Sequence, residues 1–266
     1  MSDMVEKQKN EGIIWSIDEN GILRIAKAAD GNGSIPVRPV TDSEKVYNDE
    51  GYENTTFTFE GVFHKPWTYE QEQVIKEIIV EEGITEIPFG CFSNLRNCTK
   101  IYLPDTVEKI GRWAFRFCEN LEEIDLPEGI RSFEEECFLG CKKLSSITIP
   151  QSVQVIGNKA FSYCENLKEI ELPEGLASIG EEAFRACYGL ESVTIPDSVT
   201  RIGKGAFKSC QNMHKAYVPK DRIKEFASAF DKYEAFRDYD GSIHVTGTNV
   251  YAKKKDLLGK LFKKEK

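Results

Sequence analysis

A 23-residue repeat constrains this chain more than any other feature of its sequence. Six prolines mark the repeat at one constant interval, with no insertion between copies: Pro104, Pro127, Pro150, Pro173, Pro196 and Pro219. A period of this length predicts a solenoid, in which each copy is one structural unit that stacks on the next. The 266 residues are therefore expected to form one elongated domain with a continuous core.

The same apolar side chains recur at the same offset from each proline. Three of these columns are Ile110, Phe133, Ile156, Ile179 and Ile202; Phe115, Phe138, Phe161, Phe184 and Phe207; and Cys118, Cys141, Cys164, Cys187 and Cys210. Near the end of each copy two apolar residues stand two apart, as Ile124 and Leu126 do, which is typical of a strand because alternate side chains share a face. The spacing of Ala114, Phe115 and Cys118 predicts a short helical turn on the opposite side.

The repeat, Leu-x-x-Ile-x-Leu-Pro-x-x-Val-x-x-Ile-Gly-x-x-Ala-Phe-x-x-Cys, resembles the BspA-like, or Treponema pallidum-type, class of bacterial leucine-rich repeats. The resemblance covers roughly residues 75 to 219. It implies a leucine-rich-repeat solenoid with a parallel sheet of about seven short strands and short helical turns opposite. Proteins similar to this are commonly surface adhesins or interaction modules, and the family has no shared catalytic residues.

The regions on either side of the repeats are predicted to cap the solenoid. Residues 1–12 are expected to be disordered. Residues 13–74 are expected to form a β-rich cap with a hairpin from Ile13 to Ile25 and a strand from Thr55 to Phe59, and Trp15 and Trp67 to plug the open end. The solenoid is expected to span residues 75–219. A second cap is expected over residues 220–252, with an amphipathic helix from Arg222 to Phe236 and then a small hairpin. Residues 253–266 are a basic tail.

All eight cysteines lie inside the repeats, and five of them share one column. The other three, Cys91, Cys98 and Cys137, replace alanine or leucine, so cysteine serves here as a small apolar residue. Neighbouring strands lie about 4.8 Å apart, which would bring column cysteines within disulfide range. We nevertheless expect buried free thiols, because Cys137 and Cys141 have no second ligand pair or histidine near them in sequence. Reduced thiols favour a cytosolic or anaerobic setting.

Composition and charge exclude several classes of protein. A net charge of −9 argues against a general nucleic-acid binder, and no apolar run is long enough to span a membrane. The first residues do not form a signal peptide, so the sequence as written predicts a cytoplasmic protein, and a surface or secreted one if a leader was removed. The tail from Lys253 to Lys266 could touch an anionic membrane or an acidic partner, although a solvated, frayed tail is the favoured interpretation.

No catalytic constellation is visible in the sequence. His64, His214 and His244 lie far apart, without a nucleophile elbow, a metal-spaced pair or a phosphate-binding loop. The glycines Gly111, Gly157, Gly180 and Gly203 recur at one repeat position, which indicates a backbone demand in each turn. We therefore expect a non-enzymatic protein without cofactor or metal.

Two surfaces are candidates for binding a partner. The first, here the sheet-face row, contains outward strand positions: Tyr102, Asp125, Thr148, Glu171, Thr194 and Tyr217. Tyrosine offers a large contact area at low entropic cost, although these residues could equally be only soluble strand formers. The second, the Trp113 patch, contains Arg112, Trp113, Arg116 and Phe117. Its tryptophan occupies a repeat position held elsewhere by Glu136, Lys159, Glu182 and Gly205. Trp113 is expected either to be a binding hot spot or to pack under the N-terminal region.

Three functions fit these surfaces. The first is a surface adhesion module like its bacterial relatives, which the missing signal peptide disfavours. The second is an intracellular interaction scaffold, which the free thiols and the plain N-terminus favour. The third is a carbohydrate binder that uses the tyrosines. In each of the first two the partner is another protein.

The stacked core makes a testable prediction. About eight inward side chains per copy contribute roughly 1.5–3 kcal/mol each, whereas ordering 23 residues costs on the order of 1.5 kcal/mol apiece, so a single copy cannot fold alone. We expect Phe161→Ala to lower the free energy of unfolding by about 3–5 kcal/mol, because it opens a cavity in a shared column. The double variant Tyr102→Ala, Tyr217→Ala, at outward positions, should leave folding intact and weaken partner binding. Chemical denaturation measures the stability of both proteins, and equal effects would contradict the stacked arrangement.

Overall fold

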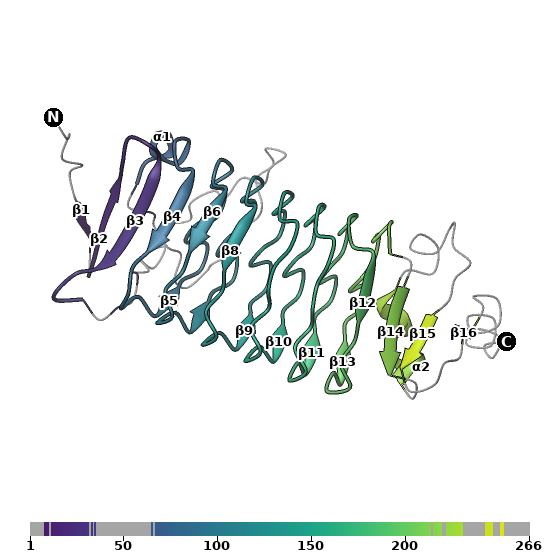
Figure 1. Ribbon diagram of the computed structural model, residues 1–266. Coiled ribbons are helices and arrows are strands. Elements are labelled where there is room, and N and C mark those ends of the chain that lie inside the picture. The colour runs from purple at the N-terminus through teal and green to yellow at the C-terminus, as the bar shows by residue number, and fades with distance from the viewer. Residues whose placement is uncertain are drawn as a thin grey trace, which may run out of the picture.

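Each repeat forms one rung of a solenoid, and the rungs stand side by side along the molecule (Figure 1). The computed structural model describes residues 8–10, 12–31, 33, 35, 65, 67–213, 215–219, 222–230, 243–246 and 251–252. Buried apolar side chains from successive rungs form one continuous core along the solenoid. The predicted leucine-rich-repeat solenoid is confirmed.

The predicted strands line one side of the solenoid. The sheet at its N-terminal end contains β1 (Gln8–Asn10), β2 (Ile13–Ile17), β3 (Ile22–Lys27), β4 (Glu77–Val80), β6 (Lys100–Tyr102) and β8 (Glu123–Asp125). The sheet at its C-terminal end contains β12 (Ser192–Thr194), β14 (Lys215–Pro219), β15 (Ile243–Thr246) and β16 (Tyr251–Ala252). Between these sheets, an isolated parallel bridge joins Thr148 to Glu171 where strands were expected.

A second parallel sheet, which the sequence analysis did not predict, lines the next side. Its members are two residues long each: β5 (Glu86–Ile87), β7 (Lys109–Ile110), β9 (Ser132–Phe133), β10 (Val155–Ile156), β11 (Ser178–Ile179) and β13 (Arg201–Ile202). The second residue of each strand belongs to the Ile110 column recognised in the sequence. A two-residue strand offers one inward and one outward position, so the alternation that marks a strand has no length in which to appear.

The remaining side consists of consecutive turns, not of the short helical turns predicted from Ala114, Phe115 and Cys118. In each rung two residues four positions apart have positive φ, for example Lys159 at 52° and Tyr163 at 59°. Left-handed residues interrupt the α-helical hydrogen-bond pattern. They turn the amides toward the next rung instead, as where Phe138 N donates to Ala160 O at 2.8 Å.

Stacked phenylalanine rings form the centre of the core. Phe138, Phe161, Phe184 and Phe207 lie nearly parallel, with ring centroids 5.2 or 5.3 Å apart at each step. All are fully buried. Because every ring contacts the rings of both neighbouring rungs, the stability of one rung depends on the rungs beside it.

The cysteine column adds hydrogen bonds to this stack. Cys118 Sγ donates to Phe92 O at 3.2 Å. The same bond to the phenylalanine 26 residues earlier recurs at 3.1–3.3 Å for the other column members, Cys141, Cys164, Cys187 and Cys210. All eight cysteines are buried, as predicted. The thiol thus does more than fill space, because its S–H donates a weak hydrogen bond to the phenylalanine carbonyl. Valine or alanine at the same position has no side-chain donor.

The N-terminal segment extends the solenoid. β2 and β3 form the predicted hairpin, and β3 pairs in parallel with β4. Trp67 stacks on Phe92 with ring planes 6° apart, and Trp15 meets Trp67 edge-on at 5.9 Å, so the two tryptophans close the phenylalanine column as expected. The short helix α1 (Tyr69–Glu72) follows, with Thr68 and Gln71 forming its capping box.

Two N-terminal predictions have different outcomes. Residues 8–10 were expected to be disordered, and this is wrong, because they form β1 and pair antiparallel with β2. Backbone hydrogen bonds to an existing hairpin order a segment whose side chains gave no strand signal. The strand predicted from Thr55 to Phe59 lies outside the described residues.

The C-terminal cap is a continuation of the repeat. Instead of one helix from Arg222 to Phe236, the described residues form α2 (Ile223–Phe226) and the 3₁₀ helix η2 (Ala227–Ala229), and Phe230 is extended. Phe207 N donates to Ala229 O at 2.9 Å, and the Phe230 ring stacks on Phe207 at 5.1 Å. Ala229-Phe230 stands 23 residues after Ala206-Phe207, so the phenylalanine column runs past Pro219, where the sequence analysis ended it. β15 then pairs in parallel with β14 and antiparallel with β16.

The left-handed turns make a prediction about Lys159. Glycine adopts positive φ without strain, so Lys159→Gly should keep or raise the free energy of unfolding. The free energy of unfolding of Lys159→Val should be about 1 kcal/mol lower than that of Lys159→Gly. The ion pair from Lys159 to Glu136 is long, at 3.8 Å, and its loss in both variants should cost little. Chemical denaturation compares the two variants. Equal stability would contradict a positive φ at this position.

The cysteine column makes a prediction about alkaline pH. Burial raises the pKa of the Cys118 and Cys210 thiols from an ordinary value of 9.0 to about 12. Between these values the folded chain keeps its thiols protonated while the unfolded chain releases protons, so the free energy of unfolding falls as pH rises through this window. Denaturation at a series of pH values should show a shallower fall in the double variant Cys118→Ala, Cys210→Ala. An identical slope in both proteins would disprove the contribution of the thiols.

Candidate functional site

The sheet-face row lies on the outer surface of the first side, as the strand alternation predicted. Pairing places Tyr102 beside Asp125, Thr148 beside Glu171, and Thr194 beside Tyr217. Tyr102 is 40% exposed, Tyr217 is half-buried, and the four residues between them are exposed. The structure therefore presents all six as one line of side chains across six rungs, at the places that the repeat offsets indicated.

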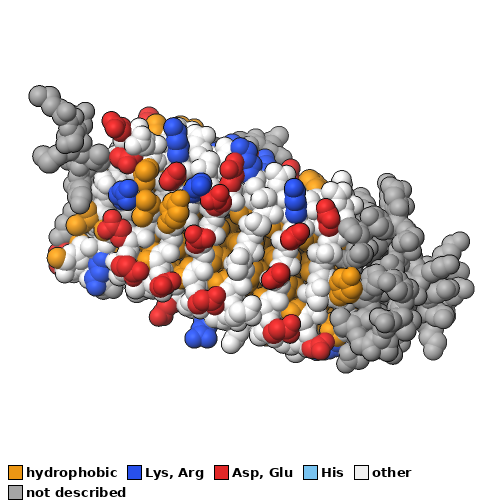
Figure 2. Space-filling view, viewed as in Figure 1, with side chains coloured by type: hydrophobic (Ala, Val, Ile, Leu, Met, Phe, Trp, Pro, Cys, Tyr) orange, Lys and Arg blue, Asp and Glu red, His pale blue; other side chains and the backbone are white. Residues whose placement is uncertain are grey.

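The strand pairing continues on both sides of these six residues. At the N-terminal end Arg24 pairs with Ile79, which pairs with Tyr102, and at the C-terminal end Tyr217 pairs with His244. Figure 2 shows acidic side chains along the whole length of this face, with apolar and basic ones beside them near the N-terminal end. Tyr217 therefore lies inside the row, flanked by β12 and β15, and Tyr102 is the more exposed of its two tyrosines.

The Trp113 patch forms an interlocked cluster on the turn side. The Trp113 ring lies against Phe89 with centroids 4.8 Å apart, and the guanidinium carbons of Arg112 and Arg116 lie 5.1 and 4.9 Å from its centroid. Arg116 also covers the Phe117 ring at 4.4 Å. The structure thus brings the four predicted residues together, and packs Trp113 against the preceding rung. Because its ring is half-buried, it offers a partner less surface than Tyr102 does.

Ion pairs hold both arginines of the patch in place. Arg112 Nη2 lies 3.0 Å from Glu135 Oε2, and Arg116 Nε lies 3.1 Å from Glu136 Oε2. Opposite charges one rung apart recur elsewhere, as in Lys100 with Glu123 at 3.0 Å, where the carboxylate raises the pKa of the lysine. Such exposed pairs add little stability individually, but they fix side-chain positions on the surface. Charges of opposite sign 23 residues apart are a signal that the sequence analysis did not use.

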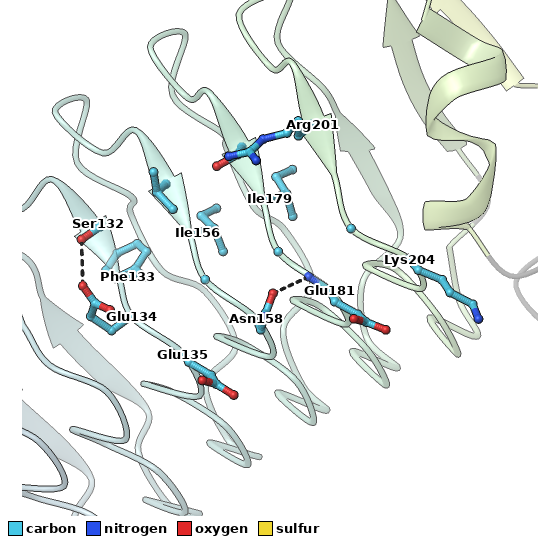
Figure 3. A pocket seen from close by; sticks show the side chains of 15 residues that line it. Ser132, Phe133, Glu134, Glu135, Ile156, Asn158, Ile179, Glu181, Arg201 and Lys204 are labelled. Carbon is cyan, nitrogen blue, oxygen red and sulfur yellow. Dashed lines mark hydrogen bonds between the residues drawn. The ribbon is translucent and has the colours of Figure 1, made fainter. Parts of the chain in front are cut away.

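A groove along the second sheet is the surface that sequence reasoning missed. It has a volume of about 480 Å³, and its lining comes from four successive rungs, between Ser132 and Lys204 (Figure 3). Gly157, Gly180 and Gly203 form its floor. The repeated glycine was visible in the sequence as a backbone demand, but the hollow depends on the second sheet, which was not.

The described residues contain no group of three or more histidine, cysteine or acidic side chains arranged to hold a metal ion. Among the same residues, none of the helices has the length and apolar character needed to cross a bilayer. The side chains of the three histidines and the basic tail from Lys253 to Lys266 lie outside the described residues.

Comparisons with known proteins agree with the repeat. The model of the BspA type leucine-rich repeat region matches six copies, over residues 66–167 and 134–253. No curated protein matches the chain. A solved leucine-rich repeat protein from T. pallidum is 21% identical, with 86% of this chain and 99% of that chain covered and a TM-score of 0.53. One from Bacteroides ovatus is 20% identical, with 80% and 65% covered and a TM-score of 0.45.

These matches differ in what they establish. At 21% identity the T. pallidum structure supports the fold alone. The family model covers well over half of the chain and finds the same repeat that the prolines mark. This chain belongs to the BspA-type leucine-rich repeat family.

Proposed function

We propose that this chain is a non-enzymatic protein-binding module whose partner docks on the sheet-face row. The observation that carries the proposal is the alignment of six outward side chains across successive rungs, from the exposed ring of Tyr102 to Tyr217. The surface mixes aromatic rings, hydroxyls and carboxylates, which suits a protein interface better than a site for one small ligand. Membership of a repeat family, in which stacked rungs present extended surfaces, supports a binding role.

The stacked core favours binding at this row energetically. Each outward residue alternates with fully or nearly fully buried ones, such as Ile101 and Ile124 beside Tyr102 and Asp125. The backbone beneath the row is therefore held before a partner arrives, and less conformational entropy is lost on binding. Tyrosine adds contact area with few rotatable bonds, so Tyr102 is the expected centre of the interface.

Two settings fit such a module. A role in adhesion at the cell surface follows the commoner role of similar repeat proteins. The eight buried free thiols favour an intracellular scaffold instead, since reduced cysteines persist in a reducing compartment. A pull-down with wild type, from extracellular matrix and from the lysate of the source cell, captures the partner and distinguishes the settings. A matrix protein supports adhesion, and a protein of the same cell supports a scaffold.

A matched pair of tyrosine variants tests the sheet-face row. Tyr102→Ala should weaken binding to the partner captured by wild type at least about tenfold, because it removes the most exposed ring of the interface. Tyr69→Ala is the control, since Tyr69 is a tyrosine that is 71% exposed on α1, away from the row. Surface plasmon resonance compares the affinities, and thermal unfolding confirms that both variants are folded.

Three results separate the alternatives. Full affinity in Tyr102→Ala would remove the row as the binding surface. A loss in Trp113→Ala alone would move the interface to the Trp113 patch. Retention of wild type on a glycan array, lost in Tyr102→Ala, would assign the row to a carbohydrate.

A further inference from the structure

The groove along the second sheet has a bare floor because of its glycines. A Cβ atom at Gly180 would lie 2.5 Å from Asn158 N, and one at Gly203 would lie 2.3 Å from Glu181 N. Both distances are too short for a side chain, so the close stacking of the rungs requires glycine here. The same requirement leaves backbone, and no side chain, along the bottom of the groove.

Two rows of side chains form its walls. Val155, Ser178 and Arg201 stand on the strand side. Asn158, Glu181 and Lys204 stand on the turn side, where Figure 3 shows Glu181 and Lys204 extending away from the strands. Asn158 Oδ1 accepts a hydrogen bond from Glu181 N at 2.8 Å, which holds this wall between two rungs. The middle of the groove therefore offers the apolar side chain of Val155 and the amide of Asn158, with the carboxylate of Glu181 at its outer edge, while Ser178 is buried.

The two ends of the groove carry opposite charges. At the N-terminal end Glu134 takes the place of the glycine, and its Oε1 accepts a bond from Ser132 Oγ at 3.5 Å. At the other end Arg201 and Lys204 are both exposed. Figure 3 shows the Arg201 side chain extending from β13 toward β11, over the groove. The described residues form no ion pair with Glu134, Arg201 or Lys204, so these charges are available to a ligand.

The separation of the charges indicates the size of the ligand. Three rung-to-rung steps separate the Glu134 and Arg201 positions, which amounts to about 15 Å at the usual strand spacing. An extended peptide advances about 3.4 Å per residue, so about four residues cover this length. The only aromatic side chain in the lining, Phe133, is fully buried, so the stacking platform typical of a sugar or nucleobase site is absent from these described residues. Val155, by contrast, is 41% exposed and can contact an aliphatic side chain.

We propose that this glycine groove binds an extended peptide segment of a partner protein. A lysine or arginine of the peptide lies at Glu134. An aspartate, a glutamate or a terminal carboxylate lies at Arg201 and Lys204, about four residues away. The groove belongs to a different sheet from the sheet-face row, so this proposal does not depend on the function proposed for that row.

Synthetic peptide libraries test the proposal directly. The probes are fluorescent libraries with lysine and glutamate fixed four positions apart, in both chain orders, and fluorescence anisotropy measures their binding to the full chain. Libraries with two lysines or two glutamates at the same spacing are the controls for charge. A library with lysine and glutamate adjacent is the control for length. We expect the mixed-charge libraries at the long spacing to bind about tenfold more tightly than each control.

Charge reversal then tests the position of the peptide. The double variant Arg201→Glu, Lys204→Glu should no longer prefer the libraries with one lysine and one glutamate. It should instead bind the library with two lysines most tightly. Val155→Trp should block all the libraries by filling the middle of the groove. These side chains are exposed, so unchanged thermal unfolding is expected and is measured for each variant.

The outcomes separate this site from the sheet-face row. Tyr102→Ala should bind the mixed-charge libraries as wild type does, even where it has lost the protein partner. Failure of wild type to prefer the mixed-charge libraries would overturn the groove proposal, and so would an unchanged preference in the charge-reversed variant. Neither result would bear on the sheet-face row, whose test is the affinity of Tyr102→Ala for the captured protein.

Discussion

Contact between successive rungs is the interaction on which the rest of this structure depends. Gly157 N donates to Phe133 O at 2.7 Å on one side of the solenoid, and Phe138 N donates to Ala160 O at 2.8 Å on another. Inside, the phenylalanine rings of successive rungs stack with their centroids 5.2 or 5.3 Å apart. A rung has few stabilising contacts of its own, so its folding free energy comes from its neighbours, and the ends must be closed. Trp67 and Phe230 continue the ring stack beyond the regular copies at the two ends.

Stacking also explains where function can lie. Inward positions must repeat, because a change of size in one rung alters the packing of two others. Outward positions are free of this constraint, and similar offsets bring them into straight rows. The candidate sites are accordingly departures from the repeat: Tyr102 in the sheet-face row, Trp113 in a slot usually held by a charged residue, and Glu134 where glycine is usual. The regular part of the sequence builds the scaffold, and the irregular residues distinguish this chain from others with the same fold.

The two proposed surfaces differ in the way they would recognise a partner. The sheet-face row crosses six rungs, a length that suits a folded protein, with Tyr102 as its most exposed ring. The glycine groove is narrow, with charges at its ends and backbone along its floor, which suits one extended chain. Since the surfaces lie on different sheets, one partner that binds both would gain affinity through simultaneous contact.

The sequence by itself determined the period, the buried columns and the outward rows, because a 23-residue spacing records which side chains face the core. It also placed Tyr102 at the surface and the tryptophan cap at the N-terminal end, and it left open whether Trp113 faces a partner or packs under the N-terminal region. Only the tertiary structure decided the second sheet, since two-residue strands are too short to show alternation. It also decided the left-handed turns, which residues as different as Lys159 and Tyr163 adopt because their backbone amides donate hydrogen bonds to carbonyls of the next rung. The groove belongs to the same class: a glycine leaves a hollow only where the backbone of the preceding rung lies against it.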